Sequence, residues 1–153
     1  MYLVDDAAQT LGRLGPEPLA CDFGAAQLGE RLGGRRAIKT ALLNQRVLAG
    51  LGNIYADEAL FVARIAPDRP AGSLTTEEIT DLYHAIRAEL RRGIEHGGTT
   101  LADYRDASGR RGRHRQHLRV YGRRGEACLA CGCTIACKRV GGRSSYHCPE
   151  CQR

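Results

Sequence analysis

The chain has 153 residues, 42% of them hydrophobic, and a formal net charge of +6 at pH 7. This length allows one domain or two small ones, and with no Trp and only two Phe their core must be aliphatic. The positive charge favours a polyanionic partner, nucleic acid first. No apolar run approaches the ~20 residues of a membrane span, and residues 1–6 lack the pattern of a signal peptide. We therefore expect a cytoplasmic monomer with no membrane partner.

The first twenty residues differ in composition from the rest. Two prolines and two glycines fall within the segment Leu11–Leu19, which is typical of a linker rather than of a helix or strand. We interpret residues 1–20 as a linker, or as the remnant of a missing N-terminal domain. Residues 21–105 then form a helical domain, and residues 106–153 form a basic connector and a cysteine-rich module.

Three helical patterns follow in chain order. Asp22 can cap a helix that runs to about Leu32, and a second helix is expected over residues 35–48. Asn53 can cap a third helix, whose inner face carries apolar residues at the helical spacing, namely Ala56, Ala59, Leu60 and Ala63. The glycines and prolines between these patterns end each helix.

The fourth helix has the clearest start. Thr75 and Glu78 form a capping box, with Leu74 and Ile79 at the positions of a hydrophobic staple. An apolar stripe then extends from Ile79 to Ile94, and glycines 97 and 98 end the helix. Four helices with one aliphatic face each can share a core.

The end of the chain contains two Cys-x2-Cys pairs separated by sixteen residues. This spacing predicts one structural Zn²⁺ held by four thiolates, those of Cys128, Cys131, Cys148 and Cys151. Two disulfides or free buried thiols are the alternatives, and Cys133 or Cys137 could replace one of the ligands. Between the pairs, two β-prone runs flank Gly141-Gly142 and predict a hairpin with Arg143 next to its tip. Taken alone, that arginine is best interpreted as a solvated turn residue.

Two further features point to phosphate binding. Gly50 and Gly52 allow backbone to approach a partner closely, and Asn53 begins a helix whose N–H groups attract an anion. A tight interhelical turn with Asn53 as a simple cap is the alternative. Seven arginines and no acidic residue lie between Arg110 and Arg124, where Arg113 and Arg115 are expected to add nonspecific phosphate contacts.

These residues also carry a family resemblance. The run from Leu43 to Glu58, with Ile38-Lys39 before it and residues 97–101 after it, resembles the helix–two-turns–helix domain of formamidopyrimidine-DNA glycosylases and endonuclease VIII enzymes. Val120-Tyr-Gly-Arg123, the cysteine pairs and Gly142-Arg-Ser144 resemble that family's zinc finger. The resemblance implies a mainly α fold, a small helical domain followed by a four-cysteine zinc-finger β-hairpin.

The resemblance also implies roles for individual residues. Asn53 would hold the DNA backbone beside the lesion nucleotide, and Arg143 would contact DNA close to the lesion. Lys39 and Glu58 would belong to the lesion-side surface of the helical domain; otherwise Lys39 is an ordinary exposed helix lysine and Glu58 a partner for a nearby arginine. The implied partner is double-stranded DNA with abasic or oxidised-base sites.

The chain departs from the family in two places. The family's nucleophile is an N-terminal proline followed by Glu, whereas this chain starts Met1-Tyr2, so we expect no catalytic residue and no base excision by the chain alone. Where the family has Gly-Tyr-Phe-Gln, this chain has Gly112-Arg-His-Arg115, which puts in doubt how the segment handles a flipped base.

Three functional hypotheses remain open. The chain is a zinc-dependent DNA-binding half of a glycosylase-like repair protein, with a separate N-terminal catalytic half as a further partner. Alternatively, it is the C-terminal part of an active glycosylase and abasic-site lyase whose N-terminal half is missing here. As a third alternative, it is an RNA- or protein-binding zinc ribbon.

Overall fold

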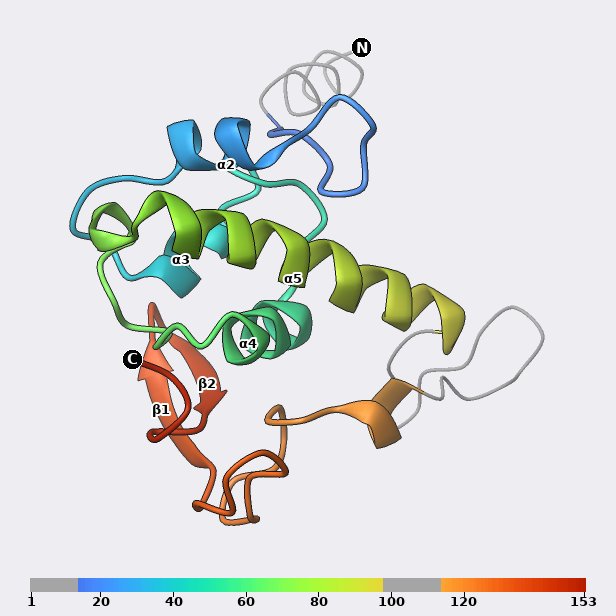
Figure 1. Ribbon diagram of the computed structural model, residues 1–153, viewed down its shortest axis with the longest axis vertical. Coiled ribbons are helices and arrows are strands. Elements are labelled where there is room, and N and C mark those ends of the chain that lie inside the picture. The colour runs from blue at the N-terminus through green and yellow to red at the C-terminus, as the bar shows by residue number, and fades with distance from the viewer. Residues whose placement is uncertain (1–13, 98–113) are drawn as a thin grey trace, which may run out of the picture.

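A computed structural model describes residues 14–97 and 114–153, with only the backbone of His114 and Arg115. The N-terminal part is helical, and the C-terminal part carries a two-stranded antiparallel hairpin (Figure 1). Helix α5 crosses the molecule between α2 and α4, and the hairpin lies beyond α4 (Figure 1). Within the described residues, no helix combines the length and the apolarity needed to span a bilayer.

The helical part consists of α2 (Ala25–Arg31), α3 (Ile38–Leu43), α4 (Asn53–Val62), the 3₁₀ turn η1 (Ala71–Ser73) and α5 (Thr76–Glu95). Their inner faces form one aliphatic core, as the composition predicted. The core is built from fully buried residues of every helix and the loops between them, including Leu28, Leu42, Leu51, Leu60, Ile65 and Leu82.

The first two helices are shorter than predicted. Helix α2 begins later than expected, with Gly24 in the N-cap position in place of Asp22, because Phe23 inserts into the core. Helix α3 covers only six residues of the expected 35–48. Its start is delayed because residues 36–38 bond to the loop at residues 69–71. It ends at Asn44, whose side-chain oxygen accepts from the Arg46 N–H and so competes with the helical ladder.

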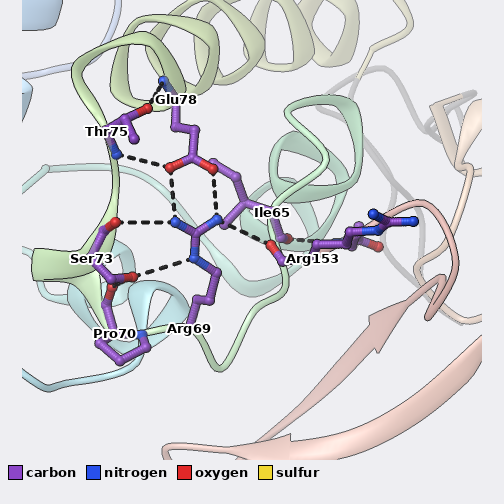
Figure 2. Close-up of polar contacts among 8 residues, drawn as sticks. Ile65, Arg69, Pro70, Ser73, Thr75, Glu78 and Arg153 are labelled. Carbon is purple, nitrogen blue, oxygen red and sulfur yellow. Dashed lines mark hydrogen bonds and ion pairs between the residues drawn. The ribbon is translucent and has the colours of Figure 1, made fainter.

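The start of α5 confirms the capping box. The Thr75 hydroxyl accepts from the Glu78 N–H, and the Glu78 carboxylate accepts from the Thr75 N–H at 2.8 Å. Figure 2 shows that the same carboxylate forms a two-pronged ion pair with Arg69, at 2.7 and 2.8 Å. Arg69 also donates to the carbonyl oxygen of Arg153. Arg69 thereby links Arg153 to the N-terminus of α5.

The far end of α5 departs from the expected apolar stripe. Leu82 and Ile86 are buried and Leu90 packs against the core, but Ile94 is 70% exposed. The last turns of this 20-residue helix extend past α4 (Figure 1). Ile94 belongs to the final turn and is not covered by the described residues.

The C-terminal part begins with the 3₁₀ turn η2 (His114–His117) and continues to β1 (Ala136–Val140) and β2 (Arg143–His147). The strands pair antiparallel, with Val140 opposite Arg143, which confirms the predicted hairpin. Both residues of the turn, Gly141 and Gly142, have positive φ, +58° and +80°. Two-residue hairpin turns of this kind strongly favour glycine.

The hairpin packs directly on the helical part. Phe61 of α4 lies in a second apolar cluster with Val120, Ile135 and the buried thiols of Cys128 and Cys148. The Arg153 N–H donates to the Arg64 carbonyl, and the Gln152 side chain donates to the Ile65 carbonyl at 2.9 Å. The linker residues from Leu14 on also pack: the Gly15 N–H donates to the Gln45 carbonyl and Arg87 donates to the Pro18 carbonyl.

Candidate nucleic-acid interface and metal centre

The four predicted cysteine ligands converge at the base of the hairpin. Their sulfur atoms lie within 4.8 Å of one another, with Sγ–Sγ distances of 3.9 Å between Cys128 and Cys151 and 3.5 Å between Cys131 and Cys148. Each cysteine pair lies in a tight turn. In the first turn, the Gly132 N–H donates to the Cys128 carbonyl. Gly132 has φ +82°, which a glycine adopts without strain.

This arrangement fits a tetrahedral zinc ion. With Zn–S bonds of about 2.3 Å, the sulfurs of a regular tetrahedron stand about 3.8 Å apart. The surroundings shift the pKa values of two of these thiols in opposite directions. Burial, and the neighbouring thiols that surround it, raise the pKa of Cys151. Burial raises the pKa of Cys128 too, but backbone N–H donors outweigh this and bring it to about 7. A cation bound between the four sulfurs would favour the thiolate form of all of them.

The remaining cysteines stay outside this group. Cys133 and Cys137 are half-buried, and neither belongs to the set of converging sulfurs among the described residues. Cys21 is exposed near the start of the chain. The structure contains all seven cysteines as free thiols, so the disulfide alternative finds no support.

Asn53 begins α4, but its side chain does not cap the helix. Gly52 occupies the N-cap position, and the Asn53 amide nitrogen donates to the carbonyl of Ser144 in β2 at 3.2 Å. The amide oxygen is buried with no hydrogen-bond partner among the described residues. Asn53 thus connects the helix start to the hairpin, and Arg143 is the residue before the carbonyl that it binds.

Lys39 is not on the surface, contrary to both of our sequence interpretations. Its side chain is fully buried and its Nζ atom lies 2.8 Å from Asp57 Oδ1 and 2.8 Å from the carbonyl oxygen of Ser144. Burial lowers the pKa of Lys39 and raises that of Asp57, and the charge of each partner opposes this shift. The first turn of α3 is held inward here because the Lys39 N–H donates to the Pro67 carbonyl. A direct contact between Lys39 and DNA is therefore excluded in this conformation.

Glu58 is also internal, so its expected place on the lesion-side surface is wrong. Its carboxylate accepts three successive backbone N–H groups, from Arg119, Val120 and Tyr121, at 2.8, 2.8 and 2.9 Å. Burial raises the pKa of Glu58, and these donors counteract the shift. The residue holds the chain segment that leads into the cysteine module, and its expected arginine partner is present only through a backbone N–H.

The two glycines before Asn53 have different local requirements. Gly50 has φ +82°, and its N–H donates to the Gln45 side chain at 2.8 Å. Gly52 has an ordinary φ of −97°, and an added Cβ there would meet nothing within 4 Å. Both are exposed. Nothing within the described chain requires a glycine at position 52, so its surface is open to a close partner.

The arginines near the hairpin divide into two groups. Arg143 is exposed beside the turn. Arg119 and Arg123 instead form ion pairs within the chain, with Glu89 at 2.6 Å and with Glu126 at 2.7 Å. Acidic side chains of the same chain therefore neutralise part of the positive charge of the segment between Arg110 and Arg124. Arg113 and the side chain of Arg115 lie outside the described residues.

Comparison with known proteins agrees with this arrangement. Residues 14–105 match the family model described as the formamidopyrimidine-DNA glycosylase H2TH domain. The chain belongs to this family. A formamidopyrimidine-DNA glycosylase of Desulfitobacterium hafniense is 57% identical over 144 residues, which are 94% of this chain and 53% of the relative. One of Edwardsiella ictaluri is 50% identical over 147 residues, 95% of this chain and 55% of the relative.

Solved formamidopyrimidine-DNA glycosylase structures share the fold. The MutM (Fpg) protein of Thermus thermophilus superposes with a TM-score of 0.84 at 48% identity, covering 92% of this chain and 54% of that one. Lactococcus lactis Fpg, solved as a complex with DNA containing an abasic site, gives 0.88 at 37% identity, covering 96% and 54%. The chain thus spans about half the length of the family members it matches, and its match is to their C-terminal half.

Our sequence analysis missed Asp57, which connects Lys39 of the helical part to strand β2 of the hairpin. Its carboxylate accepts from the Ser145 hydroxyl at 3.1 Å and from the Tyr146 N–H at 2.9 Å, besides Lys39. The available signal was its position four residues after Asn53, which places both on one face of the same helix.

Proposed function

We propose that this chain binds double-stranded DNA as the C-terminal half of a formamidopyrimidine-DNA glycosylase-like repair protein. In this proposal, one structural zinc ion holds the hairpin, and abasic or oxidised-base sites are the preferred targets. Base excision belongs to a separate N-terminal half.

The main observation in support of this proposal is the contact between Asn53 and strand β2. The hydrogen bond from the Asn53 amide to Ser144 sets the start of α4 beside the strand that begins with Arg143. A helix start offers N–H groups and the positive end of a dipole to a phosphate, and Arg143 adds a full charge nearby. The open surface at Gly52 leaves room for a DNA backbone. Relatives with 36–37% identity are solved bound to DNA containing abasic sites or a formamidopyrimidine lesion, which supports this proposal.

Zinc would act structurally. Cys128, Cys131, Cys148 and Cys151 would hold it, and a shell of four thiolates leaves no open position for a substrate. The ion's contribution is to fix the base of the hairpin, whose own apolar cluster is small.

The described residues provide no amine suited to attack on a sugar. Schiff-base chemistry needs an unprotonated, accessible amine. Lys39 is buried against Asp57, and Lys138 forms an ion pair with Asp68 at 2.8 Å. This is the reason for assigning excision to another part of the repair protein.

Fluorescence anisotropy with an abasic-site duplex tests the proposal. Affinity should fall with rising salt concentration, with a log–log slope of about −0.9 per phosphate neutralised. Undamaged duplex and single-stranded RNA serve as competitors. Stronger competition by RNA than by duplex DNA would support the alternative of an RNA-binding zinc ribbon, and binding that ignores salt would contradict phosphate recognition.

A further inference from the structure

The buried ion pair of Lys39 and Asp57 contacts strand β2 of the hairpin. Both side chains are 0% exposed. Replacing a buried ion pair with apolar residues of similar volume is often neutral or stabilising, so such a pair is weak grounds for a purely stabilising role. Unlike an apolar contact, a charged hydrogen-bonding group fixes the orientation of the groups that it binds.

Every polar contact of this pair to the hairpin ends on three consecutive residues. Lys39 donates to the Ser144 carbonyl, while Asp57 accepts from the Ser145 hydroxyl and the Tyr146 N–H. The Ser144 carbonyl also receives the Asn53 amide at 3.2 Å. One carbonyl oxygen therefore fixes both the lysine and the asparagine, and it belongs to the residue next to Arg143.

We propose that Lys39, acting with Asp57, is a positioning residue for the DNA contacts of Asn53 and Arg143 and does not itself touch DNA. The ammonium group sets the Ser144 carbonyl, and that carbonyl sets the orientation of the Asn53 amide and the start of β2. The predicted effect on DNA affinity rests on the proposed function. The predicted effect on the orientation of the Asn53 amide applies to the free protein as well.

Two variants of the pair and one matched control test this proposal. Lys39→Met removes the directed contact but leaves Asp57 as an uncompensated buried charge, which can impair folding. The double variant Lys39→Met/Asp57→Asn removes that charge too, while the amide oxygen introduced at position 57 can still accept from the Tyr146 N–H. Lys138→Met is the control, since it removes the same charge from the hairpin at an ion pair whose lysine side chain is 36% exposed.

The first measurement needs no DNA. In zinc-loaded protein, NMR follows hydrogen exchange of the Asn53 side-chain amide. Exchange should accelerate about tenfold in both Lys39 variants and stay unchanged in Lys138→Met. Without Lys39 the Ser144 carbonyl is no longer held in place, so the hydrogen bond that protects the Asn53 amide is weakened. Unchanged exchange in the folded double variant would overturn the positioning role. This result stands whether or not the wild-type chain binds DNA, so failure of the proposed function is recognised separately.

The second measurement uses abasic-site duplex. The double variant should bind about tenfold more weakly than wild type, and the same change in an Asn53→Ala background should have a clearly smaller effect, because the two residues act through one carbonyl. The salt slope should stay the same. A slope reduced by about 0.9 relative to the Lys138→Met control would show that Lys39 contacts a phosphate directly and would contradict the inference. Full affinity in the double variant would do the same.

Discussion

At the scale of single residues, the proposed DNA surface depends on two side chains that are far apart in sequence. The Ser144 carbonyl accepts from Asn53 at the start of α4 and belongs to the residue that follows Arg143. We expect Asn53→Ala and Arg143→Ala each to weaken binding to abasic-site duplex by roughly 1–3 kcal/mol, as for hydrogen bonds that involve a charged group. Anisotropy titrations at one fixed salt concentration measure this. Arg91→Ala, at an exposed arginine of α5 outside the basic run, removes equal charge as a control.

The two glycines before Asn53 should respond differently to alanine. Gly52→Ala should cost at most about 1 kcal/mol of folding stability, as expected for an N-cap change, yet weaken DNA binding because the methyl group occupies the open surface. Gly50→Ala should destabilise the fold by about 1–2 kcal/mol, since φ is +82° there. Thermal melts and anisotropy on both variants separate the effects. Equal affinity of Gly52→Ala and wild type would argue against close DNA approach at this point.

At the scale of elements, the hairpin and α4 should lose structure together when metal is removed. The hairpin and the segment before it supply the partners of Lys39, Asp57 and Glu58, all at most 1% exposed. Unfolding this module would leave the Lys39–Asp57 ion pair in place but would remove its hydrogen bonds to the hairpin, and it would remove the three N–H donors of Glu58. Losing these partners is costly in a buried position. We expect one zinc per chain by elemental analysis. Chelation or Cys131→Ser should lower the melting temperature of the helical part as well, measured by far-ultraviolet circular dichroism. Cys21→Ser, at an exposed thiol outside the cluster, should change neither quantity.

The start of α5 predicts a specific pH dependence. Hydrogen bonds from Arg69 and from the Thr75 N–H lower the pKa of Glu78 from 4.5 to about 2. A carboxylate with a depressed folded-state pKa contributes stability that is fully present above about pH 4.5 and is lost as the pH falls toward 2. Glu78→Gln should therefore be less stable than wild type at pH 7, by about 1 kcal/mol given its partial exposure. The difference should shrink as the pH falls through this range. Urea titrations follow it, and a difference that grows on acidification would refute the assignment.

For the whole molecule, we predict that the 153-residue chain alone neither releases oxidised bases nor cleaves abasic sites at the rate of a full-length relative. The lysines at 39 and 138 are both engaged in ion pairs, and an ordinary lysine amine is largely protonated at neutral pH. Single-turnover assays on abasic-site and oxidised-purine duplexes test this, with borohydride added to trap a Schiff base. A covalent adduct formed at the relative's rate would place the chemistry within this chain.

Local patterns in the sequence predicted those elements that depend on local interactions. The capping box of α5, the Gly-Gly hairpin and the cysteine pairs each combine residues within a few positions of one another, and all three are present. The same reasoning failed for Lys39 and Glu58. Their partners in the C-terminal part lie more than 60 residues away, so their burial depends on how the hairpin docks. A charged residue on a helix is exposed by default, and only a long-range partner reverses this.

Helix α4 carries two neighbouring carboxylates that hold different parts of the chain, Asp57 the hairpin and Glu58 the segment before it. This has a consequence for the order of events during synthesis. The Tyr146 partner of Asp57 is made 89 residues later, which takes roughly 5–20 s at ribosomal rates of ~5–20 residues per second. Small helical units fold in microseconds to milliseconds. Until the C-terminal part emerges, the Lys39–Asp57 pair therefore lacks its hydrogen bonds to β2 and Glu58 lacks its three N–H donors, so the final packing around α4 forms last.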